Sequence, residues 1–202
     1  MRGLKQKISP MIAAEVEERL LVIKQLIRSI SLDLQGINAW RYQRQMSPGI
    51  QEFIEAISFQ HYLQTQSLIK HNEVSQIIPE GVRLTVDDYV LGIFDVVGEL
   101  MRFAITTAAT SGSLPGSGEA SSNSERTILE DLWSLSAYLE ALDTASSGRT
   151  GLGKDVQKKM EVMKTCVNKV EIAAYGMIIR GRERPKGWVP NTSDYQPPIE
   201  NH

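Results

Sequence analysis

The stretch LTVDDYVLGIFDVVGELMRFAI, residues 84–105, decides the fold class of this chain of 202 residues. It opens with Thr85 and, three residues later, Asp88, an order typical of the first turn of an α-helix. Beyond this start, apolar residues occupy almost every side of a helical wheel, and we expect the helix to reach about Ala109. A helix of this kind belongs in a protein interior, so other helices are expected to cover it.

The same helix carries charges that argue against a membrane span. Residues 89–109 form the most apolar stretch of the sequence, yet they contain Asp95, Glu99 and Arg102. No long apolar run follows the first residues, MRGLKQK, as it would in a secretory signal. We therefore expect a soluble, intracellular protein with no membrane partner.

Apolar residues recur at intervals of three and four along most of the remaining sequence. Ser9 and Pro10 suit the N-cap and first position of a helix, and Gly36 and Gly181 suit helix ends. The tripeptide Ser47-Pro48-Gly49 is expected either to kink a helix or to begin a new one. The expected helices are 10–34, 39–70, 85–109, 125–143 and 154–180, with a break around 78–81.

These patterns predict an all-α fold, a bundle of long antiparallel helices. Neither a period-2 strand pattern nor an internal repeat is present in the sequence. We expect one helical domain over residues 1–186, with a mobile Gly/Ser-rich loop at about 110–124. Proline and polar residues predict an irregular tail over 187–202.

Composition excludes several classes of function. The chain has 22 Lys and Arg against 24 Asp and Glu, which excludes a highly basic nucleic-acid binder of the histone type but leaves a local basic patch open. A single cysteine excludes an internal disulfide framework, and three unclustered histidines make a structural zinc site a poor fit.

Two apolar helices each carry a pair of acids. Glu52 and Glu55 lie about one turn apart on a helix that is apolar nearly all round. Because the side that carries the acids is apolar as well as the opposite side, both faces are expected to be covered. Asp95 and Glu99 share a face with Arg102 in the most apolar helix. Two carboxylates about 5 Å apart repel by roughly 3 kcal/mol at an effective dielectric near 20, so enclosed acids need a counter-charge.

A divalent cation such as Mg²⁺, or Mn²⁺ in its place, is one counter-charge that carboxylate oxygens bind well. The ordinary alternative stays open: Asp95 or Glu99 pairs with Arg102, while Glu52 and Glu55 face solvent. No Glu precedes a histidine at the spacing of di-iron bundles. Asp87 and Asp88 lack the third acid of a prenyl-diphosphate site, and the glycines at 111–118 lack the features of a phosphate loop.

Two basic clusters are candidate contacts for phosphates. Arg41 and Arg44 flank the aromatic residues Trp40 and Tyr42. The second cluster, near the end of the last expected helix, consists of Arg180, Arg182, Arg184 and Lys186. Aromatic side chains stack on unpaired bases and basic ones neutralise phosphates, although basic residues also favour solvated helix ends. Arg102 lies one turn from the acids, where it would hold either a phosphate or a carboxylate.

Three stretches resemble the translin-associated factor X branch of the translin family. They are SPGIQEFIEAISFQHYLQTQSLI (47–69), LTVDDYVLGIFDVVGELMRFAI (84–105) and KVEIAAYGMIIRGRERPK (169–186). The second is the most specific, because Asp-Tyr-x-x-Gly-x-x-Asp-x-x-Gly-Glu-Leu-Met-Arg is long and ordered. Translin itself resembles the chain in fold but lacks these acids. The family normally has a further N-terminal helix before the segment that corresponds to residues 10–34, and the resemblance does not include that helix.

The resemblance implies an all-helical, translin-like subunit of a hetero-oligomer with translin, typically an octameric shell. Such complexes are Mg²⁺-dependent endoribonucleases on single-stranded RNA, in the cytoplasm and nucleus, linked to passenger-strand removal in RNA silencing and to tRNA-fragment processing. The family's catalytic, metal-binding acids correspond to Glu52, Glu55, Asp95 and Glu99. Two other readings stay open: a non-catalytic RNA-binding partner of translin, and a helical scaffold with no RNA role.

Overall fold

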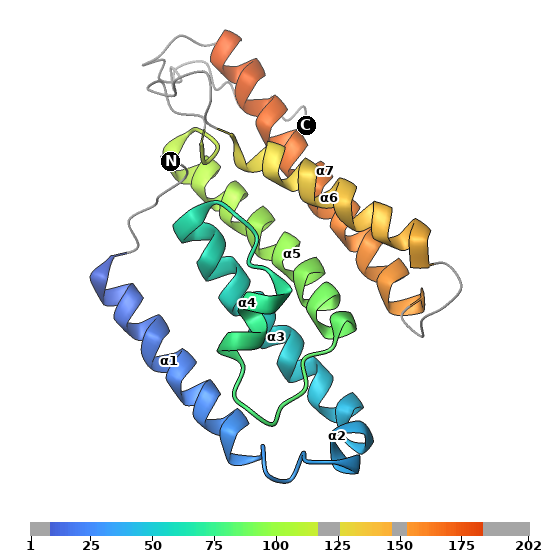
Figure 1. The fold of residues 1–202 in the computed structure, drawn as a ribbon. Coiled ribbons are helices and arrows are strands. Elements are labelled where there is room, and N and C mark those ends of the chain that lie inside the picture. The colour runs from blue at the N-terminus through green and yellow to red at the C-terminus, as the bar shows by residue number, and fades with distance from the viewer. Residues whose placement is uncertain (1–8, 117–125, 147–152, 184–202) are drawn as a thin grey trace, which may run out of the picture.

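The computed structural model describes residues 9–116, 126–146 and 153–183. Within these ranges all regular structure is helical, which confirms the all-α prediction (Figure 1). The helices are α1 (Pro10–Ser29), α2 (Ile37–Arg41), α3 (Gln43–Thr65), α4 (His71–Ile77), α5 (Val86–Ser111), α6 (Ile128–Ser146) and α7 (Gly153–Glu183). The expected tail over 187–202, with Arg184 and Lys186, lies outside the described residues.

Helix α5 forms the centre of the bundle, as its apolar sequence predicts. It packs against α3, α6 and α7, and these neighbours bury the apolar side chains in the middle of the helix. Ile93, Val96, Val97 and Leu100 are at most 2% exposed. The neighbours of α5 within this chain therefore cover its apolar middle.

The long helices do not simply alternate in direction. Residues of α3 meet residues of α5 in ascending order, since Ser47 bonds to Asp88 and Phe59 stacks edge-on against Phe103. Helices α6 and α7 are antiparallel, because Trp133 bonds to Glu171 whereas Glu140 pairs with Lys164. Helix α4 and its flanking segments return the chain, so that α3 and α5 run the same way (Figure 1).

Two helix starts agree with the sequence. Ser9 Oγ accepts a hydrogen bond from the Ile12 amide at 3.3 Å, with Pro10 in the first turn of α1. Thr85 Oγ1 accepts from the Asp88 amide at 3.0 Å and begins α5. Each cap satisfies an amide that has no partner inside its helix.

Several predicted boundaries were wrong. Helix α1 ends at Ser29, and Gly36, with φ of 59°, precedes α2 instead of ending α1. Helix α3 begins at Gln43 and continues through Pro48. Gly181 lies inside α7, because that helix continues to Glu183. Helix α4 was not predicted; Gln66, in the left-handed conformation, ends α3 and separates the two.

The Gly/Ser-rich segment contains residues that pack into the core. Of the expected loop at 110–124, α5 occupies the first positions, and Leu114 is only 8% exposed within the core. The Ile128 amide donates to the Pro115 carbonyl at 3.2 Å, which joins this segment to the start of α6. The loop expected at about 110–124 is therefore packed into the core at Leu114, and residues 117–125 lie outside the described ranges.

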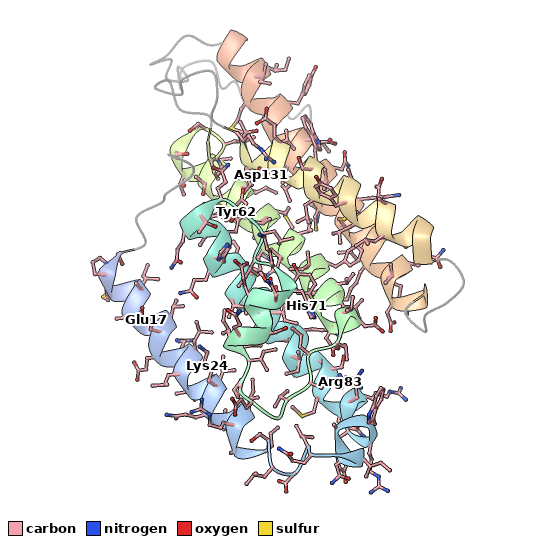
Figure 2. The ribbon with its side chains drawn as sticks, in the orientation of Figure 1. Glu17, Lys24, Tyr62, His71, Arg83 and Asp131 are labelled. Atoms are coloured by element: carbon pink, nitrogen blue, oxygen red, sulfur yellow. The ribbon has the colours of Figure 1, made fainter. Side chains whose placement is uncertain are left out.

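The far end of α3 is fastened to α6. Tyr62 Oη donates to Asp131 at 2.8 Å, and Figure 2 shows the two side chains close together. Arg126 pairs with the same carboxylate at 2.7 Å.

Among the described residues, no helix combines the length and the apolar character needed to cross a membrane.

Candidate functional site

The four predicted acids line one pocket of about 520 Å³, which we call the acid pocket. Glu52 and Glu55 come from α3, and Asp95 and Glu99 come from α5. They meet because α3 and α5 run in the same direction in close contact, which sets the middle of one helix beside the middle of the other. Helix α7 completes the lining with Lys159 and Val162.

Glu55 shows the charge accumulation most clearly. Its pKa is raised from an ordinary 4.5 to about 7: burial is the largest cause, followed by the charges of Asp95, Glu52 and Glu99 and a hydrogen bond with Glu99. Burial disfavours an ionised carboxyl, and neighbouring negative charges add to that effect. Three acidic neighbours on two helices thus act on one carboxyl, which is the clustering expected from the sequence.

Asp95 has a cationic partner that the sequence did not suggest. Lys159 Nζ on α7 donates to the two carboxylate oxygens of Asp95 at 2.5 and 2.6 Å. The residues are 64 positions apart. Lys158 and Lys159 look like ordinary solvated helix positions, and only the packing of α7 on α5 reveals the pair.

Arg102 pairs with Glu99, one turn before it on α5. Its side chain is 70% exposed, whereas that of Glu99 is 27% exposed. One of the two open alternatives for Arg102, a pair with Glu99, is thus observed. An exposed ion pair of this kind contributes little to stability, so Arg102 can exchange partners at low cost.

The pocket offers a metal ion the right chemistry but not a finished coordination sphere. Within the described ranges, no three His, Cys, Asp or Glu side chains converge in an arrangement that could hold a metal ion. Two of the four carboxylates are paired with Lys159 and Arg102. The donors are nonetheless all carboxylate oxygens, and the negative charges that add to the effect of burial on the pKa of Glu55 are ones that a cation would offset. All four acids offer the oxygen ligands that Mg²⁺ or Mn²⁺ prefers, but to bind such an ion Asp95 and Glu99 would first have to leave Lys159 and Arg102.

The remaining basic candidates are dispersed. Arg44 lines a second pocket beside the acid pocket, together with Trp40. Arg41 is exposed at the end of α2. Arg180 and Arg182 lie on the last turns of α7, where the side chains are outside the described part of the structure. Of the candidates whose side chains are described, Arg102 lines the acid pocket and Arg44 lines the pocket next to it.

Asp88 is a buried anchor rather than a surface residue of a helix's first turn. It is 2% exposed, and four side chains donate to its carboxylate. Those donors are Gln43 (2.7 Å), Thr85 (2.6 Å), Gln51 (3.4 Å) and Ser47. A buried carboxylate persists when hydrogen bonds replace its water, and here they tie the start of α3 to the start of α5.

Residues 2–181 match the model of the Translin family. The chain belongs to the translin family. It is similar to Translin-associated protein X from Mus musculus, with 30% identity over 201 residues that cover 87% of this chain and 63% of the relative. The Translin-associated protein X homolog of Schizosaccharomyces pombe is 28% identical over 164 residues, covering 78% of this chain and 62% of the relative. Translin from Gallus gallus is 21% identical over 173 residues, covering 83% and 69%.

The chain therefore spans a little under two thirds of the length of the first two relatives. A crystal structure described as apo-NeC3PO matches with a TM-score of 0.54 and 16% identity, covering 86% of this chain and 77% of that chain. At this identity the likeness supports the fold alone. The family and the higher identity to Translin-associated protein X agree with the resemblance of the sequence motifs.

Proposed function

We propose that this protein is the catalytic subunit of a translin-type complex, a Mg²⁺-dependent endoribonuclease that cleaves single-stranded RNA. The observation that carries the proposal is the acid pocket, where Glu52, Glu55, Asp95 and Glu99 meet between α3 and α5. Burial and the charges of the other three acids together raise the pKa of Glu55 to about 7, which supports the proposal that these carboxylates form one cluster. Its RNA would be of the kind handled in passenger-strand removal or tRNA-fragment processing.

A bound divalent cation would supply activation of water and neutralisation of the phosphate's charge. Two basic residues of the chain would change partners when the cation and the RNA bind. Lys159 would release Asp95 as the cation takes over its charge, and the freed ammonium group would be available to a phosphate oxygen. Arg102 would exchange Glu99 for the scissile phosphate, which its exposure permits.

Exposed apolar side chains support a hetero-oligomer with translin. Leu21, Val22 and Leu26 on α1 are 49–63% exposed. Helices α6 and α7 present a further set: Trp133, Tyr138, Val162, Ile172, Tyr175 and Ile178. Large apolar side chains exposed on several helices of one chain are typical of a subunit surface. A subunit of a translin-type shell would bury them against its neighbours.

A non-catalytic, RNA-binding or scaffold partner is the second candidate. The observation in its favour is that Asp95 and Glu99 already have cationic partners in Lys159 and Arg102. In that case the acids only form ion pairs, and neither Mg²⁺ nor neutral substitutions at Glu52 or Glu55 would alter the behaviour of the protein toward RNA.

The deciding experiment is co-expression with translin, followed by cleavage of a labelled single-stranded RNA in Mg²⁺ and in EDTA. The nuclease proposal expects cleavage in Mg²⁺ alone and a loss of several orders of magnitude in Glu55→Gln and Asp95→Asn, with RNA binding retained. A folded Asp95→Asn complex that cleaves at the wild-type rate would refute it. Glu17→Gln on the exposed side of α1 is a matched control, because it removes one carboxylate far from the pocket.

A further inference from the structure

A larger pocket of about 1040 Å³ adjoins the acid pocket. We call it the flanking groove, and it is lined by Trp40, Arg44, Arg83, Lys158 and Lys159 among other residues. The two pockets share Pro48, Gln51 and Lys159, so a chain-like ligand is able to pass from one to the other. The groove lies where α2 and the first turns of α3, α5 and α7 meet, and Arg83 is labelled at this end in Figure 2.

Trp40 and Arg83 form a flat, accessible platform in the groove. The Arg83 guanidinium lies 3.8 Å from the centre of the Trp40 ring, and Trp40 remains 68% exposed. A large aromatic side chain with this exposure contributes little to the core. Indole rings and guanidinium planes are the surfaces on which unpaired bases stack.

Positive charge follows the groove toward the acid pocket. Arg44, Arg83, Lys158 and Lys159 all line it, and Lys159 also contacts Asp95. Asp87 and Asp155 are the exposed carboxylates among the lining residues, so the cations outnumber them. Asp88 also lines the groove, but it is buried and its oxygens accept hydrogen bonds from four side chains.

We propose that the flanking groove binds the nucleotides adjacent to the scissile phosphate of a single-stranded RNA. A base stacks on the Trp40–Arg83 platform, Arg44 and Lys158 hold phosphates, and Lys159 marks the passage into the acid pocket. This inference rests on the proposed function, because that proposal places the scissile phosphate in the acid pocket. Stacking accepts every base and needs an unpaired one, so the groove selects single strands without reading their sequence.

The test is fluorescence anisotropy of a labelled oligouridine of about ten nucleotides, in EDTA so that no cleavage occurs. Trp40→Ala is expected to weaken binding about fivefold or more, and Trp40→Phe to retain most of the affinity. Lys158→Ala is expected to reduce the slope of log affinity against log salt by about 0.7, the effect of one phosphate contact. A duplex containing the oligouridine should bind more weakly than the single strand.

One control lies outside the groove. Lys164→Ala removes a cation from the same helix as Lys158. It is expected to bind the oligouridine as the wild type does. If Trp40→Ala and Lys158→Ala also bind as the wild type does, or if the wild type does not bind, the subsite is refuted.

The experiments distinguish failure of the nuclease proposal from failure of the RNA subsite in the flanking groove. Selective loss of binding in the groove variants supports the subsite even if the wild type never cleaves RNA in Mg²⁺, which would refute only the nuclease. Cleavage by the wild type, combined with unaltered binding by the groove variants, would refute only the subsite.

Discussion

Gly92 on α5 lies so close to Ile54 on α3 that a Cβ atom added at Gly92 would be 2.9 Å from both the Cβ and the Cγ2 atom of Ile54. The Gln51 carbonyl oxygen would be 3.0 Å away. Only a residue without a side chain permits this approach, and the helices could not otherwise bring their acids into one pocket.

Gly92→Ala is therefore expected to separate α3 from α5. We expect a loss of about 1–3 kcal/mol in the free energy of unfolding, because the contact involves a buried side chain and backbone. Gly98→Ala on the same helix is the matched control: nothing lies within 4 Å of its added Cβ, and it should stabilise by about 0.5–1 kcal/mol. Urea unfolding measures both, and equal effects at the two glycines would contradict the close contact.

Glu55 should make stability depend on pH. Its pKa in the folded protein is about 7 against an ordinary value of 4.5, so the folded state binds this proton more tightly than the unfolded state does. Its contribution is complete below about pH 4.5 and is lost as pH rises to about 7. Glu55→Gln removes that loss and should gain stability relative to the wild type between pH 4.5 and 7. Urea midpoints in EDTA across this range check it, and a constant difference would contradict it.

Lys159→Met should make the protein depend on a divalent cation for stability. Without the ammonium group, Asp95 faces the other acids with no counter-charge, so the melting temperature in EDTA is expected to fall. Mg²⁺ should then raise the melting temperature of Lys159→Met more than that of the wild type, where Lys159 competes for Asp95. If Mg²⁺ has no effect on either protein, the acids form ion pairs only.

Asp88→Ala should destabilise the protein although it leaves the four acids of the acid pocket unchanged. It leaves the donors on α3 and α5 without their shared acceptor, and hydrogen bonds to a charged group contribute about 1.5–3 kcal/mol each. We expect a loss of about 3 kcal/mol or more in the free energy of unfolding. The exposed neighbour Asp87 provides the control, since Asp87→Ala should change stability by less than about 1 kcal/mol. Similar losses at both positions would contradict the anchoring role.

The acids of the pocket could be predicted because their signal is local. Carboxylates at helical spacing within apolar helices mark enclosed charge, and Glu52, Glu55, Asp95 and Glu99 were grouped on that basis. Lys159 could not be found in this way, because its partner is distant in the sequence and its neighbours are ordinary surface residues. Asp88 was assigned only to a helix's first turn, although the donors around it include residues of a different helix.

Helix directions were also beyond local reasoning. Short connections favour antiparallel neighbours, and the α4 segment, which was not predicted as a helix, allows α3 and α5 to run in parallel. Leu114 was missed because glycine and serine dominate the residues around it. In each case a contact between distant parts of the chain overrides the local composition.

The shared direction of α3 and α5 has a consequence for how the protein is made. The pairing of Ser47 with Asp88 joins residues 41 positions apart, and that of Lys159 with Asp95 joins residues 64 positions apart. Contacts this far apart close slowly compared with those of helical hairpins. A chain emerging from the ribosome exposes its four acids well before Lys159 has been synthesised, so the nascent protein passes through a stage in which their repulsion has no counterweight from α7.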